Sequence, residues 1–69
     1  MNHRETIVRL DGTGVDGDKG TLLIYRIGND FSIVATTEQN GDAEVILDKS
    51  AMQQLVQALL QTLAQTQFP

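Results

Sequence analysis

Residues 48–67, DKSAMQQLVQALLQTLAQTQ, decide which fold this chain can adopt. Apolar side chains recur in this stretch at intervals of three and four residues, which places them along one side of an α-helix. We call this set the apolar stripe, and it comprises Met52, Leu55, Val56, Leu59, Leu60 and Leu63. Asp48 stands where a helix N-cap belongs, and no proline or glycine follows it within the stretch. The sequence therefore predicts a long amphipathic helix that buries its stripe against the rest of the chain.

The residues before this helix predict four β-strands. The expected strands span 6–10 (TIVRL), 21–27 (TLLIYRI), 31–37 (FSIVATT) and 43–47 (AEVIL). Four glycines and three aspartates among residues 11–20 indicate a loop, and Gly28-Asn29-Asp30 and Asn40-Gly41 have the composition of tight hairpin turns. The expected fold class is α+β, a four-stranded antiparallel meander followed by one C-terminal amphipathic helix packed on the sheet (β-β-β-β-α).

Successive residues of a strand point to opposite sides of a sheet, so each expected strand carries two sets of side chains. In the strand over 21–27, Leu22 and Ile24 share one side and Leu23 and Tyr25 share the other. Whether the first hairpin loop has two or three residues decides how these sets join the next strand, and the sequence leaves that open. With either loop, neither side of the sheet is purely polar.

The small size of the chain predicts self-association. Its 69 residues form a single domain, in which we expect residues 1–5 to be flexible. A lone core of this size supplies roughly 3 to 5 kcal/mol, and without cysteine the remaining support is oligomerisation. A helix is about 10 Å wide and four strands span roughly 19 Å at about 4.8 Å each, so one helix leaves part of the sheet uncovered. We therefore expect a homo-oligomer, specifically a dimer.

Candidate interface residues are apolar strand residues that one helix leaves uncovered, together with two amides from the polar side of the helix. Uncharged amides cost less to desolvate than charged groups, which suits a hydrogen-bonded contact. The set comprises Leu22, Ile24, Val34, Ile46, Gln57 and Gln61.

Acidic residues gather in the connections that a meander brings to one end of the sheet. The helix is expected to run back towards this end, and its last turns carry no Lys or Arg to offset the partial negative charge of a helix C-terminus. We call the set the acidic pole, and it comprises Asp11, Asp16, Asp18, Glu38 and Asp42. With a net charge of −4, the chain is poorly suited to general binding of nucleic acid or anionic membrane. A basic protein is the partner that such a pole fits.

Two glycine and aspartate motifs in residues 11–20 fall short of known binding sites. Gly12, Gly14 and Gly17 spell GxGxxG, but they lead into a strand, whereas a dinucleotide site needs a helix after the glycines. Asp16-Gly17-Asp18 lacks the third ligand and the distal glutamate of an EF-hand calcium loop. Weak cation binding at the acidic pole stays open, and no cofactor or metal site is expected.

The sequence offers no set of catalytic residues. His3 is the only imidazole and lies in the segment expected to be flexible. Glu38, Asp42 and Glu44 could pair as general acid and base only if burial raised the pKa of one of them, and nothing in the pattern indicates such burial. We expect that the protein is not an enzyme.

The junction GDAEVILDKSAMQQLVQALLQTL, residues 41–63, resembles in layout the PC4-like transcription coactivator domains. The shared feature is a last strand that passes through a short cap into an amphipathic C-terminal helix. Domains of that family are dimers that bind single-stranded DNA, so the resemblance implies both properties as expectations. Their sheets present basic and aromatic side chains to the strand, for which this chain offers Arg9, Arg26 and Tyr25. No functional residue is carried over from the family.

Together these patterns predict a small acidic, non-enzymatic protein-interaction or regulatory module that acts as a homodimer. The alternative is a weak single-stranded nucleic-acid binder with a PC4-like layout. No apolar run is long enough for a signal sequence or a membrane span, so we expect no membrane contact and a cytoplasmic location.

Overall fold

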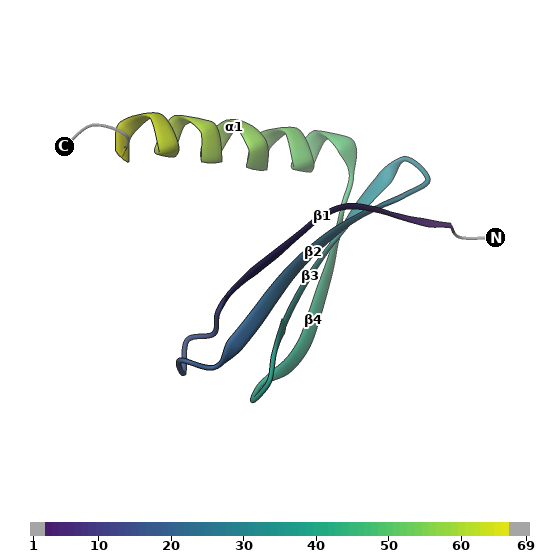
Figure 1. Ribbon diagram of the computed structural model, residues 1–69. Helices are drawn as coiled ribbons and strands as arrows, with labels where there is room; N and C mark the ends of the chain where they lie inside the picture. Colours follow the sequence, from purple (N-terminus) through teal and green to yellow (C-terminus); the bar gives the residue numbers. More distant parts are fainter. Residues whose placement is uncertain (1–2, 67–69) are drawn as a thin grey trace.

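A computed structural model describes residues 3–66 and shows a four-stranded antiparallel sheet followed by one helix (Figure 1). The strands lie in the order β1-β2-β3-β4, and the helix α1 contacts β3 and β4. The elements are β1 (Arg4–Thr13), β2 (Lys19–Ile27), β3 (Asp30–Thr37), β4 (Gly41–Leu47) and α1 (Lys49–Thr66). The expected α+β fold class is therefore confirmed.

The first hairpin is longer than the sequence predicted. Gly12 pairs with Gly20 and Thr13 pairs with Lys19, so both strands continue into the stretch expected to be a loop. Backbone hydrogen bonds of a ladder need no side chains, which is why a glycine-rich composition did not prevent pairing. Only residues 14–18 form the turn, and β1 begins at Arg4, inside the segment expected to be flexible. Residues 1 and 2 lie outside the described residues.

The second hairpin settles the register that the sequence left open. Ile27 pairs with Asp30, so the loop has two residues, and Gly28 supplies the positive φ of 60° that such a tight turn needs. The third turn comprises residues 38–40. Gly41, with a φ of 76°, pairs with Thr37 as the first residue of β4. The Asn-Gly pair therefore predicted the position of this turn, but not that it has three residues.

This register sorts the strand side chains into two faces. Tyr25 lies opposite Ser32, whereas its neighbour Ile24 lies opposite Ile33. The mixed face contains Arg4, Thr6, Arg9, Leu23, Tyr25, Ser32, Val34, Glu44 and Ile46. The apolar face contains Val8, Leu10, Leu22, Ile24, Phe31, Ile33, Ala35, Ala43, Val45 and Leu47, together with one ion pair, Glu5 and Arg26. As expected, neither face is purely polar.

The sheet curls so that the mixed face is concave. Arg4 and Glu44 belong to the two outer strands, yet their side chains meet at 2.8 Å. The register of β1 shifts between Thr6 and Val8, and such a bulge bends a strand (Figure 1). Inside the curve Ser32 is fully buried, with 0% of its surface exposed.

The helix begins as predicted but leaves the sheet after its first turns. Asp48 Oδ1 accepts a hydrogen bond from the Ala51 backbone N–H at 2.8 Å, which confirms the N-cap. Ala51, Met52 and Leu55 are half-buried, whereas every residue from Val56 to Thr66 is exposed. Figure 1 shows the C-terminal end of α1 standing apart from the loops of the sheet. The helix end therefore does not add its partial charge to the acidic pole as expected.

Replacing Asp48 with alanine is expected to destabilise the protein by about 1 kcal/mol, because the Ala51 N–H loses its acceptor at the start of the helix. Urea unfolding followed by circular dichroism measures this loss. The Asp48→Ser variant keeps a capping oxygen and should retain most of the stability. Equal losses in both variants would contradict the capping role.

The described chain has no apolar core of its own. None of the apolar side chains in residues 3–66 is buried. The accessible surface is 5658 Å², whereas a globular monomer of 7.6 kDa exposes about 4300 Å². The radius of gyration is 13.9 Å, against about 11 Å for a compact chain of this length. Along residues 3–66 there is no helix with the length and hydropathy to cross a membrane.

Candidate functional site

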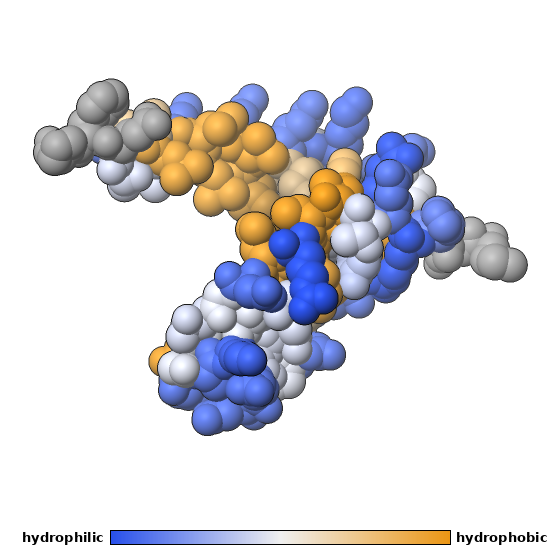
Figure 2. Space-filling model, in the orientation of Figure 1, coloured by the Kyte–Doolittle hydropathy of each residue, from blue (hydrophilic) through white to orange (hydrophobic). Residues whose placement is uncertain are grey.

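The most distinctive surface is a wedge between α1 and the sheet. One wall is the apolar stripe and the other is the apolar face, and Figure 2 shows hydrophobic side chains continuing from the helix onto the sheet. At the narrow end, a hollow of about 400 Å³ lies between Phe31 and the first turns of α1. Farther out, Leu60 is 61% exposed and Leu63 is 62% exposed. Contiguous apolar surface of this kind marks an interaction site.

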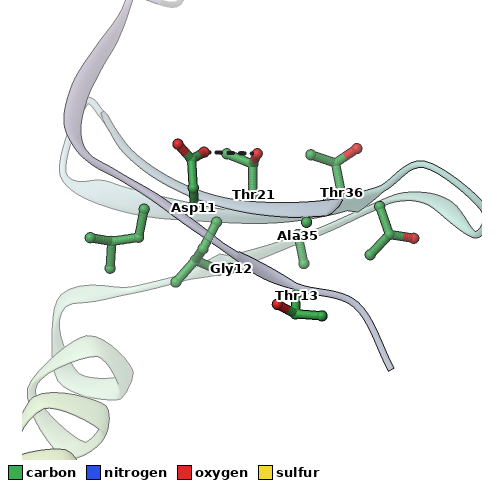
Figure 3. Close-up of a pocket in the computed structure, with 10 residues that line it drawn as sticks. Asp11, Gly12, Thr13, Thr21, Ala35 and Thr36 are labelled. Carbon is green, nitrogen blue, oxygen red and sulfur yellow. Dashed lines mark hydrogen bonds between the residues drawn. The ribbon is translucent and has the colours of Figure 1, made fainter. Parts of the chain in front are cut away.

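A second, smaller hollow of about 230 Å³ lies on the sheet where two paired glycines leave space that side chains would fill (Figure 3). Gly12 and Gly20 pair across β1 and β2 and contribute no side chain. In Figure 3, Asp11, Thr21 and Thr36 project to one side of the strands, and Asp11 accepts a hydrogen bond of 3.3 Å from the Thr21 hydroxyl. Besides the glycines, the hollow is lined by Leu10, Leu22, Ala35 and threonines, and Asp11 is its one charged residue.

The mixed face holds one compact polar cluster. Arg4 donates to Glu44 at 2.8 Å and lies over the Tyr25 ring, 5.2 Å from its centroid. The Ser32 hydroxyl also donates to Glu44. The hydrogen bond from Arg4 and then that from Ser32 lower the pKa of Glu44, and the same contact with Glu44 raises the pKa of Arg4. The cluster joins the two outer strands, so its role is to hold the curvature of the sheet.

The stability that Glu44 contributes is expected to depend on pH. Because the pKa of Glu44 is lowered in the folded state, its contribution is complete above the ordinary glutamate pKa of about 4.3 and is lost as the pH falls through the lowered value. The free energies of unfolding of the wild type and Glu44→Gln should differ at pH 7 and converge towards pH 3. A difference that stays constant over this range would contradict the coupling.

The acidic pole lies at the end of the sheet that holds the first and third connections. Several of its carboxylates accept hydrogen bonds between these connections. Asp18 Oδ2 accepts from the Gln39 N–H at 2.9 Å, and Asp16 Oδ2 accepts from the Asn40 side chain at 3.1 Å. Glu38 Oε1 accepts from the Lys19 N–H at 3.4 Å. These bonds tie the first loop to the third. The other two members lie on strands, Asp11 on β1 and Asp42 on β4.

The described residues do not gather into a metal or catalytic site. Across residues 3–66 no three His, Asp or Glu side chains lie close enough together to hold a metal ion. His3 is exposed ahead of β1. Glu38 lies in a turn, whereas Glu44 is engaged by Arg4 on the mixed face, so these two carboxylates are not arranged as an acid and base pair.

The predicted interface residues divide between surfaces. Leu22 and Ile24 lie on the apolar face, whereas Val34 and Ile46 lie on the mixed face. Gln57 borders the hollow beside Phe31. Gln61 is just over three turns into the helix and, at 100° per residue, lies on the side opposite the stripe. The structure thus brings Leu22 and Ile24 together on one face, but it does not gather all six predicted interface residues on one surface.

The sequence did not single out Leu10, Val45 or Arg4. The strand register puts Leu10 and Val45 on the same face as Ile24. The sequence left this register open, so it could not place them there. Arg4 lay in a segment expected to be flexible, and its partner Glu44 is 40 residues away. No local signal could have found that pair.

No protein-family model, curated protein or solved structure matches this chain.

Proposed function

We propose that this protein is a non-enzymatic interaction module that works as a homodimer, with the wedge as its dimer interface. The observation that carries the proposal is the absence of any buried apolar side chain in residues 3–66. Burial of apolar surface is the main favourable term in folding, and a chain that leaves its stripe and its apolar face in water forgoes most of it. A second copy covering the wedge supplies the missing core.

The exposed area fits this arrangement in size. The chain exposes about 1400 Å² more than a globular monomer of its mass. A specific protein interface buries about 800 Å² on each partner, and obligate dimers bury more. One copy therefore carries enough surplus surface for its half of a stable dimer.

Symmetry and charge favour a second copy as the occupant. In a twofold dimer both partners use the same surface patch, so a single contact covers the wedge of each copy. The net charge of −4 would oppose self-association, but no charged residue follows Lys49, and the carboxylates of the first and third connections lie at the other end of the sheet. The walls of the wedge therefore carry few charges, namely Lys49 and the mutually paired Glu5 and Arg26, and no carboxylate of the first or third connection.

Multi-angle light scattering tests the proposal. At micromolar concentration we expect a single species of twice the chain mass of 7.6 kDa. Dilution should lower the thermal midpoint, because the dimer and the folded state are coupled. A folded monomer at every concentration would overturn the proposal.

We further propose that the acidic pole binds a basic protein and that the protein is cytoplasmic. Asp11, Asp16 and Asp42 are exposed, so their carboxylates are open to a cationic partner, whereas Asp18 is occupied by the contact between the loops and its Oδ1 is buried. Joint replacement of Asp11, Asp16, Asp18 and Asp42 by asparagine should abolish capture of a polylysine probe. Unchanged capture would refute this contact.

A second candidate is weak binding of single-stranded nucleic acid, favoured by the placement of Arg9 and Tyr25 on the concave mixed face. Stacking on an aromatic ring beside a cation is the general means of binding single strands. Arg26 lies on the other side of β2, and Arg4 is engaged by Glu44, so the cationic surface is small. Fluorescence anisotropy with a labelled oligonucleotide at low salt decides the question, and no binding there ends it.

A further inference from the structure

We infer that the α1 helices of two copies pack antiparallel, stripe against stripe, so that each helix lies in the wedge of the other copy. This arrangement rests on the proposed homodimer and specifies which elements meet. It places two helices at the centre of the dimer, with the apolar face of one sheet on each side. Two observations carry it, namely the shape of the exposed stripe and the distribution of charge along α1.

The stripe has the width and position that a central helix pair needs. At 100° per residue its six residues span about 140° of the helix circumference. Its half-buried members, Met52 and Leu55, face the start of the wedge, whereas the exposed members continue beyond the contact with the sheet. They are Val56, Leu59, Leu60 and Leu63. Such a stripe can touch a neighbouring helix and a sheet at the same time, which is what an element inside a wedge must do.

The length of the exposed stripe fixes where the helices cross. Its midpoint falls between Leu59 and Leu60, so an antiparallel twofold brings Leu60 near the axis. Val56 then lies opposite the partner's Leu63. A parallel twofold would instead bring each stripe residue opposite its own equivalent along the whole helix.

The charges of α1 favour the antiparallel direction. Lys49 is the first residue of the helix, the first turn holds no acidic residue and the last turn holds no basic residue. A cation at the N-terminus and none at the C-terminus is the reverse of what the dipole of a single helix favours. In an antiparallel pair, Lys49 lies near the C-terminal end of the partner helix and supplies the positive charge that this end lacks. At the N-terminal end the Asp48 carboxylate already provides negative charge, so what a parallel pair would leave without a counter-charge is the C-terminal end of each helix.

Single cysteine substitutions test the arrangement, because the chain has no cysteine of its own. Under mild oxidation of the full chain, we expect Leu60→Cys to form a disulfide-linked dimer. Met52→Cys and Leu63→Cys should not, because each lies far from the axis. Gln61→Cys, on the opposite side of the helix, is the matched control and should remain unlinked. The double variant Val56→Cys/Leu63→Cys should link two chains through both positions.

The outcomes separate this inference from the proposed homodimer. Dimeric mass with efficient linking of Met52→Cys and Leu63→Cys as well as Leu60→Cys would show a parallel pair and overturn the inference. Dimeric mass with no linking at any stripe position would also overturn it and would leave the homodimer standing. A monomeric mass for the unmodified chain would overturn both.

Charge reversal gives an independent measurement. Lys49→Glu should raise the dimer dissociation constant by about 3- to 30-fold, since two symmetric contacts with a helix end are lost. Arg9→Glu makes the same change of charge on the mixed face and should leave the constant within about twofold of the wild type. Equal effects of the two variants would overturn the antiparallel direction.

Discussion

The Leu60→Lys variant is expected to be monomeric where the wild type is a dimer, with a dissociation constant raised at least about 30-fold, or roughly 2 kcal/mol. Leu60 is 61% exposed in a single copy, so a lysine at this position is solvated in the monomer and costs it little. In the dimer the same ammonium group lies between two apolar stripes, where an unpaired charge costs several kcal/mol. Lysine also reduces the net charge of −4, so any weakening arises in spite of lower long-range repulsion.

Sedimentation equilibrium measures this change directly. The monomer that results has no buried apolar side chain in its described part, so we also expect loss of cooperative thermal unfolding at the same concentration. Gln61→Lys is the matched control, because it introduces the same charge one residue away on the opposite side of α1. It should dimerise like the wild type. A dimeric Leu60→Lys variant with the wild-type dissociation constant would show that the stripe is not the interface.

The helix was predictable because its determinants are local. The three-and-four spacing of the stripe and the cap at Asp48 depend on residues within a few positions of one another, and Asp48 does accept the hydrogen bond from Ala51. The turn positions were predictable for the same reason, since Gly28 and Gly41 adopt the positive φ values that tight turns require. Element order and short connections then fixed the antiparallel meander.

The curvature and the wedge were not predictable, because they depend on contacts between distant residues. The bulge between Thr6 and Val8 and the contact of Arg4 with Glu44 bend the sheet, and no local pattern encodes either. The direction of α1 follows from how β4 passes into the helix on this curved sheet. A width comparison predicted that one helix would leave apolar surface uncovered, but it could not predict that the helix would project from the sheet.

The candidate interface was only partly predictable, because it required the register. With a two-residue loop after Ile27, Leu22 and Ile24 join the apolar face, and Val34 and Ile46 join the mixed face. With one more residue in that loop, each side chain of β3 would lie on the other face relative to β2. Because the length of this loop was open, the predicted interface combined residues from both faces of the sheet.

Substitution of neighbouring residues on β4 is expected to show which face is covered. Val45→Lys should raise the dissociation constant at least about 30-fold, roughly 2 kcal/mol, whereas Ile46→Lys should change it less than about threefold. The two side chains are equally exposed in one copy, at 57% and 53%, so the monomer gives no reason for different effects. They differ in direction, since Val45 lies opposite Ile33 on the apolar face and Ile46 lies opposite Ser32 on the mixed face.

The pair is matched in charge, strand and exposure, so a large difference between the variants reports chiefly what covers each face. A lysine at position 46 lies on the same face as Glu44, which further limits its cost. Sedimentation equilibrium of both variants at equal concentration supplies the comparison. A dimer weakened by Ile46→Lys and unaffected by Val45→Lys would place the interface on the mixed face, and the wedge would then need a different occupant. Equal weakening by both would indicate that the substitutions act on the strand itself, because no single twofold contact covers both faces of one sheet.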